Sequence, residues 1–161
     1  LRLGSGGSTV LTSALLLNIT SVETDATFLR GVSEDPVVVA AARRGLWRGV
    51  FADIGAVGMW GRPTSDKESH KWPNYGRAIA DAGPEFDLVL DDGRFRVATA
   101  AAALTHLSSE GRLLLHDATR AVYKQVLDWY TLDRMAETLH ALRPKPGAAV
   151  APKDVDWMNY A

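Results

Sequence analysis

Cysteine is absent from the 161 residues of this chain. Its absence excludes disulfide bonds, thiolate metal sites and cysteine nucleophiles. It also fits a reducing compartment, so we expect a cytoplasmic protein.

Net charge and long apolar runs are also scarce. The chain has 18 Lys and Arg against 19 Asp and Glu, and this net charge of −1 gives no overall attraction to nucleic acid. Arg43 and Arg44 are more typical of a solvated helix end than of a nucleic-acid site. No stretch approaches the run of about 18 apolar residues that a membrane helix needs, and none resembles a secretion signal. We therefore expect neither nucleic acid nor a membrane as a partner.

Length and composition are those of one soluble domain. The chain is 47% apolar and 23% charged, and its length suits a single hydrophobic core. We expect one domain over residues 1–161, in which residues 143–161 form a loosely ordered tail. Only residues 1–3 precede Gly4, whereas a typical strand has about five or six residues. The first strand is therefore expected to be truncated.

Apolar strand patterns alternate with helical patterns along the chain. Strands are predicted at residues 1–3, 19–23, 46–52, 86–90 and 113–115, and a further pair within 132–142. Helices are predicted at 9–17, in two segments between 25 and 44, and at 74–82, 94–107 and 121–130. The alternation predicts an α/β, Rossmann-like fold, with a doubly wound, mostly parallel sheet and helices on both faces. Ligands of such sheets bind beyond the carboxyl ends of the strands.

The segment 54–75 shows neither helical nor strand periodicity. Its glycines and prolines indicate a long loop, and Trp60, Trp72 and Tyr75 give it aromatic anchors. A binding loop or lid and an ordered structural excursion remain equally open.

A glycine-rich turn, Gly4 to Thr9, links the first strand to the first helix. Its small residues allow a ligand to approach backbone amides at the helix start, although a flexible turn is the alternative. Glu23 ends the next strand about 20 residues later, at the spacing where adenosine-binding folds place a carboxylate for the ribose hydroxyls. We favour the ribose role over that of a solvent-facing glutamate.

Three further strand ends carry acidic or histidine side chains. Asp53 follows the third strand, where it could contact the exocyclic amine of an adenine or could serve only as a turn or cap residue. Of the adjacent Asp91 and Asp92, one can reach the site while the other caps a helix. His116 and Asp117 offer a general base or one metal ligand, with a helix cap and a partly buried histidine as alternatives. A full set of metal ligands is not apparent.

With these positions the chain resembles the class I S-adenosylmethionine-dependent methyltransferases, and especially a small bacterial branch of that family. The resemblance covers nearly the whole chain. Its most specific stretches are the tryptophan-bearing loop and DGRFR. The stretches that carry it are LGSGGSTV (3–10), SVETD (21–25), ADIGAVGMWGRP (52–63), FDLVLDDGRFRVA (86–98) and LLHD (114–117).

The resemblance implies a seven-stranded sheet with S-adenosylmethionine lying across its first strands, and methyl transfer to an unidentified small molecule. The implied cofactor-binding residues are Gly4, Ser5, Gly6, Gly7, Ser8, Glu23, Asp53, Ile54 and Asp91. The implied acceptor-side, catalytic residues are Asp92, Arg94, His116 and Asp117. The chain departs from the family at Arg2, where relatives usually carry an acidic residue two places before the first glycine.

Two other functions compete with methyl transfer. An NAD-dependent oxidoreductase would also use Glu23, but Thr9 occupies the place of the third glycine in G-x-G-x-x-G. A cofactor-binding or catalytically degenerate domain is the second alternative, and Arg2 and the short first strand favour it.

Overall fold

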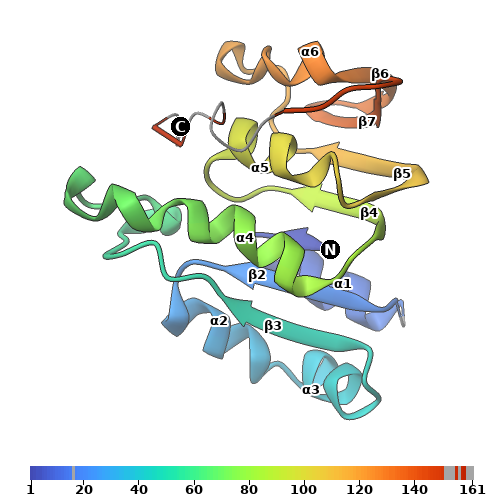
Figure 1. Ribbon diagram of the computed structural model, residues 1–161. Coiled ribbons are helices and arrows are strands. Elements are labelled where there is room, and N and C mark those ends of the chain that lie inside the picture. Colours follow the sequence, from blue (N-terminus) through green and yellow to red (C-terminus); the bar gives the residue numbers. More distant parts are fainter. Residues whose placement is uncertain (16, 151–154, 156, 159–161) are drawn as a thin grey trace.

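A computed structural model describes residues 1–15, 17–150, 155, 157 and 158. Seven strands form one sheet in the order β3-β2-β1-β4-β5-β7-β6 (Figure 1). Strands β1 to β5 are parallel, whereas β7 is antiparallel to both β5 and β6. The strands are β1 (Arg2–Leu3), β2 (Ile19–Glu23), β3 (Trp47–Phe51), β4 (Phe86–Asp91), β5 (Leu107–Leu115), β6 (Tyr130–Ala136) and β7 (Leu139–Pro144). The predicted mostly parallel sheet, its short first strand and its final pair of strands are confirmed.

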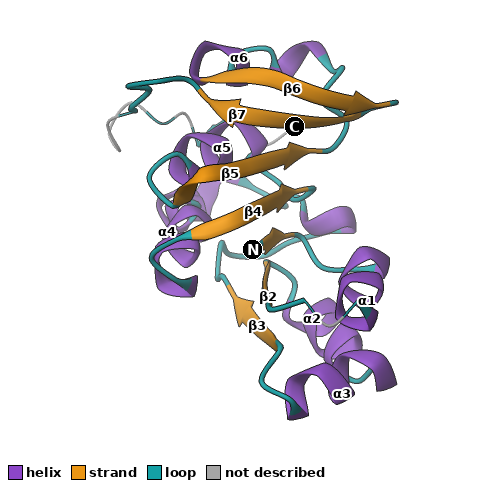
Figure 2. Ribbon diagram, turned by 90° about the vertical axis from the view of Figure 1, so that its right-hand side faces the viewer, coloured by secondary structure: helices purple, strands orange, loops and turns teal. Residues whose placement is uncertain are grey.

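Helices cover both faces of the sheet, as predicted for a doubly wound fold. Figure 2 shows α1, α2 and α3 on one side, with α4 and α5 on the other. The helices are α1 (Gly7–Ala14), α2 (Ala26–Ser33), α3 (Pro36–Arg43), α4 (Pro73–Ala82), α5 (Arg96–Ala103) and α6 (Val126–Trp129). Three 3₁₀ segments complete the chain: η1 (Met59–Gly61), η2 (Asp66–Lys71) and η3 (Ala121–Tyr123). Among the described residues, no helix is both long and apolar enough to cross a bilayer.

Short polar signals set the limits of the two helices after β2. The Asp25 carboxylate accepts hydrogen bonds from the amides of Thr27 and Phe28, at 2.8 and 3.0 Å, and so caps α2. Asp35 caps α3 in the same way, with Pro36 at the first helical position. The two helical segments predicted between residues 25 and 44 are confirmed.

The core lies between the central strands and the helices on either face. Leu3, Val89 and Leu113 are fully buried in neighbouring strands. On the side of α4 and α5, the ring of Phe95 packs at 5.4 Å from Trp72 and 5.6 Å from Trp157, centroid to centroid. Part of the tail predicted at 143–161 therefore contacts the core, and the last residues of β7 belong to that predicted tail. Residues 151–154, 156 and 159–161 of the tail lie outside the described residues.

Several element limits differ from the sequence-based expectations. The helix predicted at 94–107 begins at Arg96 and ends at Ala103, because Leu107 pairs with Phe86 and starts β5. That strand spans nine residues, whereas three were predicted. The prediction missed its first half because that half is polar and largely exposed. The helix predicted at 121–130 divides into η3 and the four-residue α6, and the one at 9–17 ends at Ala14. The predicted loop contains η1 and η2.

Leu88, inside the predicted strand 86–90, is 42% exposed. Strand β1 has two residues, and these lie beside Leu90 and Asp91 rather than beside Leu88.

Candidate functional site

A cavity of about 620 Å³ opens beyond the carboxyl ends of the parallel strands. Its volume is in the range of pockets that hold small molecules and cofactors. The glycine turn and the end of β2 form one side, and the segments after β4 and β5 form the other. The predicted residues that line it are Gly4, Ser5, Gly6, Gly7, Ser8 and Glu23 on the first side, and Asp92, Arg94, His116 and Asp117 on the second.

The two sides of the cavity meet where the β1–α1 turn touches the β4–α5 turn. Gly4 has φ +82°, which favours glycine, and a Cβ atom there would lie 3.1 Å from Cα of Gly93. A Cβ atom on Gly93 would lie 2.0 Å from the Tyr75 hydroxyl oxygen. Two glycines are therefore needed for the turns to approach each other over the buried Tyr75.

Glu23 is fixed at the end of β2 by backbone amides. Its Oε2 accepts a hydrogen bond from the Ser5 amide at 2.7 Å, and its Oε1 accepts from the amides of Thr24 and Asp25 at 2.7 and 3.2 Å. Glu23 is 7% exposed. The structure thus brings the glycine turn and Glu23 into direct contact, 18 residues apart in sequence.

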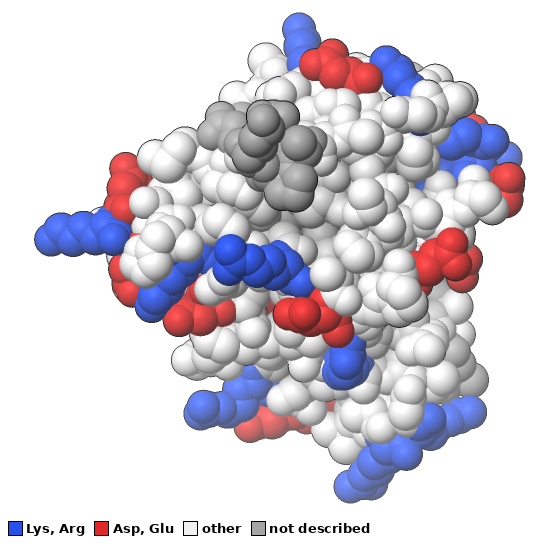
Figure 3. Space-filling view, viewed as in Figure 1, with Lys and Arg blue, Asp and Glu red and all other residues white. Residues whose placement is uncertain are grey.

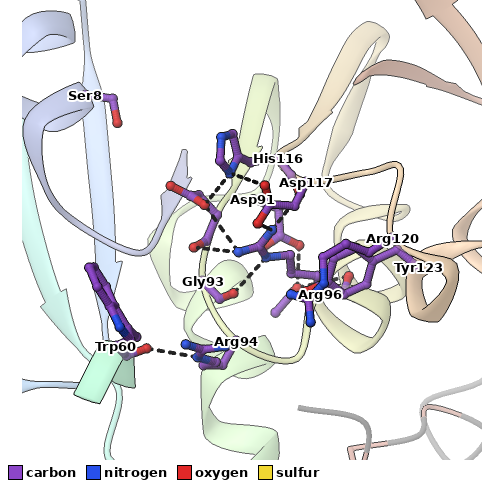
Figure 4. Close-up of polar contacts among 12 residues, drawn as sticks. Ser8, Trp60, Asp91, Gly93, Arg94, Arg96, His116, Asp117, Arg120 and Tyr123 are labelled. Atoms are coloured by element: carbon purple, nitrogen blue, oxygen red, sulfur yellow. Dashed lines mark hydrogen bonds and ion pairs between the residues drawn. The ribbon is translucent and has the colours of Figure 1, made fainter. Parts of the chain in front are cut away.

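On the opposite side, Arg96 joins the β4–α5 turn to the end of β5 (Figure 4). Its guanidinium donates to the carbonyl oxygens of Gly93 and His116, at 2.9 and 2.5 Å, and lies 3.3 Å from Asp92 Oδ1 and 3.5 Å from Asp117 Oδ2. His116 Nδ1 lies 3.0 Å from Asp92 Oδ1 and 3.5 Å from Asp117 Oδ1. The predicted Asp92, His116 and Asp117 are therefore assembled around an arginine that sequence reasoning missed.

The loop between β3 and α4 reaches the cavity through η1. Trp60 is 82% exposed and lines the cavity, and its carbonyl oxygen accepts a hydrogen bond of 2.9 Å from Arg94 Nε (Figure 4). Trp60, Asp117 and Phe95 have φ values of +61°, +54° and +58°. Such left-handed conformations are costly outside glycine and often mark functional sites. Three of the strained positions in the described chain are thus in the loops that border the cavity.

Three of the predicted cofactor-binding residues do not line the cavity. Asp53 faces away: its carboxylate lies 3.2 Å from Lys71 Nζ and accepts from the Gly55 amide, and these contacts lower its pKa. Ile54 is 1% exposed and belongs to the core.

Asp91 is the third residue that does not line the cavity, because it is completely buried beneath it. Its Oδ2 accepts a hydrogen bond of 2.5 Å from the Thr99 hydroxyl. Burial raises the pKa of Asp91 to about 7, against the opposing effects of Thr99 and Arg96. The neighbouring Asp92 is the member of the pair that reaches the cavity.

Arg2 lines the cavity although sequence reasoning marked it only as a departure from the family pattern. It is 4% exposed, and its Nη1 donates a hydrogen bond to the Ser8 hydroxyl. Its Nε is buried without a hydrogen-bond partner in the described part of the chain. Other lining residues to which the sequence analysis gave no site role are Thr24, Asp25, Phe28, Gly61, Tyr75, Gly93, Arg96 and Arg120.

Charged side chains of both signs line the cavity. On the face in Figure 3, Lys and Arg side chains are interspersed with Asp and Glu rather than gathered into one field. Within the described ranges, no cluster of three or more His, Cys, Asp or Glu side chains has the arrangement of a metal site.

The fold is similar to that of a methyltransferase-like protein from Silicibacter pomeroyi. The crystal structure of that protein matches with a TM-score of 0.79 at 29% sequence identity, over 99% of this chain and 86% of that chain. No protein-family model matches the sequence, and no curated protein matches it. The chain therefore has a methyltransferase-like α/β fold, with its cavity at the carboxyl edge of the sheet.

Proposed function

We propose that the cavity binds S-adenosylmethionine and that the protein transfers its methyl group to a small-molecule acceptor. The observation that carries this proposal is the contact of Glu23 with the glycine turn inside a cavity of cofactor size. The similarity to a methyltransferase-like protein supports it.

Glu23 has the geometry to hold a ribose. Its Oε2 accepts one hydrogen bond from the described chain, whereas a carboxylate oxygen can accept two. A hydroxyl of the sugar can therefore be bound without displacing the Ser5 amide. Because the three amide contacts fix the carboxylate before the ligand arrives, little side-chain entropy is lost on binding.

Aromatic rings at the cavity rim suit a planar base. Phe28 and Trp60 both line the cavity, and they are 49% and 82% exposed. Stacking of a base on such a ring contributes about 1 to 3 kcal/mol.

The side of the cavity around His116 suits the acceptor. Bound S-adenosylmethionine supplies an electrophilic methyl group. His116 can take the proton that an acceptor hydroxyl or amine loses when it becomes bonded to that methyl carbon, and the nearby Asp92 and Asp117 carboxylates stabilise the resulting imidazolium. Arg94 and Arg96 hold the loops that position these groups.

The test is calorimetric titration of the protein with S-adenosylhomocysteine and, separately, with NAD. We expect the first to bind and the second not to bind. Replacing Glu23 by alanine removes a charged hydrogen-bond acceptor, so affinity should fall by about 1.5 to 3 kcal/mol. Glu34→Ala, at an exposed position after α2, is the matched control and should bind as the wild type does. Tight binding of NAD, or an unchanged affinity in Glu23→Ala, would contradict the proposal.

A second candidate function is a domain that binds a ligand without turnover. The observation in its favour is the buried Arg2 at a position where the resembled family usually carries an acid. Binding of S-adenosylhomocysteine with no methyl transfer to any small-molecule acceptor in a radiolabel screen would support this candidate, whereas transfer would exclude it.

A further inference from the structure

We infer that Arg2 and the first amides of α1 form an oxyanion subsite in the cavity, which takes a carboxylate or phosphate group of the ligand. This subsite deepens the proposed function and rests on it for the nucleoside part of the ligand. The preference for an anionic group is the new element.

The first observation is the state of the Arg2 guanidinium. Arg2 is 4% exposed and lines the cavity. Within the described chain its one side-chain partner is the neutral Ser8 hydroxyl, and Nε has none. A buried cation without a charged partner is costly, and this cost would be recovered when an anion binds.

The neighbouring carboxylates do not neutralise Arg2. Asp92 and Glu23 are close enough to favour its charged form, yet burial still lowers the pKa of Arg2. Asp92 Oδ1 lies 3.3 Å from Arg96 and 3.0 Å from His116, and Glu23 accepts three backbone amides. Neither carboxylate comes within 4.0 Å of Arg2 among the described ion pairs. The guanidinium can therefore accept a further anionic partner.

The second observation is the position of this guanidinium at the start of α1. Its Nη2 lies 3.9 Å from where a Cβ atom of Gly6 would be, beside the first turn of the helix. Gly7 and Ser8 are the first two helical residues, so their amides precede the intrahelical hydrogen bonds. Helix amides and a guanidinium that face the same space bind carboxylates and phosphates well.

The subsite also explains why an arginine rather than an acidic residue stands at position 2. An acid there would attract an ammonium group, whereas an arginine repels it and attracts an oxyanion. A ligand of this cavity should therefore present its negative group to the glycine turn.

The test compares ligand pairs that differ by one anionic group, by calorimetry in a chloride buffer. The pair of AMP and adenosine reports a phosphate, the pair of S-adenosylhomocysteine and its decarboxylated analogue reports a carboxylate, and inorganic phosphate serves as a probe without nucleoside. In at least one pair, the anionic member should bind about tenfold more tightly or better. The gap should vanish in Arg2→Gln and persist in Arg43→Gln, a control at the end of α3.

Because Arg2 is buried in β1, a second variant tests the subsite independently of folding. In Ser8→Asp a carboxylate is placed beside Arg2 and at the start of a helix, where an acid is stabilising. This variant should fold and lose binding of inorganic phosphate. An unchanged affinity for phosphate in Ser8→Asp, or equal affinities within both ligand pairs of the wild type, would overturn the inference.

The results separate this inference from the proposed function. If phosphate or AMP binds in an Arg2-dependent way and S-adenosylhomocysteine does not bind, the subsite stands and the methyltransferase proposal fails. If S-adenosylhomocysteine, AMP and inorganic phosphate all bind equally to the wild type and to Arg2→Gln, the proposal stands and the subsite fails.

Discussion

At the scale of single residues, the cavity depends on two positions where a side chain would not fit. Gly4 and Gly93 allow the turns after β1 and β4 to touch, and Tyr75 fills the space below them. The sequence pointed to Gly4 because it lies in a glycine-rich turn. Gly93 gave a weaker signal, since the need for it comes from Tyr75, 18 residues earlier in the chain.

Replacing Gly93 by alanine should destabilise the protein by about 1 to 3 kcal/mol, because the new methyl group would displace the buried Tyr75 ring. The measurement is the free energy of unfolding in urea. Gly31→Ala is the control: nothing lies within 4 Å of its Cβ position in α2, and alanine should stabilise the helix by about 0.5 to 1 kcal/mol. Equal effects of the two substitutions would show that Tyr75 does not depend on Gly93.

At the scale of elements, η1 is joined to the β4–α5 turn by the hydrogen bond from Arg94 to the Trp60 carbonyl. The sequence left open whether the long loop is a binding loop or an ordered excursion. The structure shows ordered 3₁₀ segments and also places Trp60 at the cavity. Both descriptions therefore apply to different parts of the loop.

Replacing Arg94 by glutamine should loosen η1, because it removes the charged donor to Trp60. We expect trypsin to cleave after Arg62 several-fold faster than in the wild type under native conditions, in line with local opening. Arg77→Gln on the exposed side of α4 is the control. If both variants are cleaved at the wild-type rate, Arg94 does not hold this loop.

The limits of prediction are also clearest at this scale. Helices α2 and α3 were predicted because Asp25, Asp35 and Pro36 are local signals that act on the next few residues. The length of β5 was missed, since its first half is exposed and has no apolar pattern, and its pairing with β4 is visible only in three dimensions.

The same distinction holds for the site. The glycine turn and Glu23 follow a fixed spacing, so the sequence could identify them together. The role of Arg96 could not be read there, because its partners include the His116 carbonyl oxygen, 20 residues away. The sequence also does not show that the Asp53 carboxylate pairs with Lys71 Nζ, at 3.2 Å.

At the scale of the whole molecule, the sheet places a buried carboxyl group, Asp91, at its centre. Hydrogen bonding to Thr99 does not compensate for its burial, and the pKa of Asp91 is raised to about 7. An unfolded aspartate releases its proton near pH 3.9. Between about pH 4 and 7 the folded state therefore holds a proton that the unfolded state has lost.

This difference makes stability fall as the pH rises from about 4 to 7, because the folded state binds more protons than the unfolded one. Asp91→Asn should remove much of that fall. The measurement is the free energy of unfolding at pH 5 and pH 7, with Asp81→Asn at an exposed position as the control. A difference between the two pH values that is as large in Asp91→Asn as in the wild type would show that other groups cause it.

The contact between the backbones at Gly4 and Gly93 couples the two sides of the cavity mechanically. Since no side chain separates the two turns, a displacement of one turn would press on the other. A ligand that moves the glycine turn would therefore also move the segment that carries Asp92.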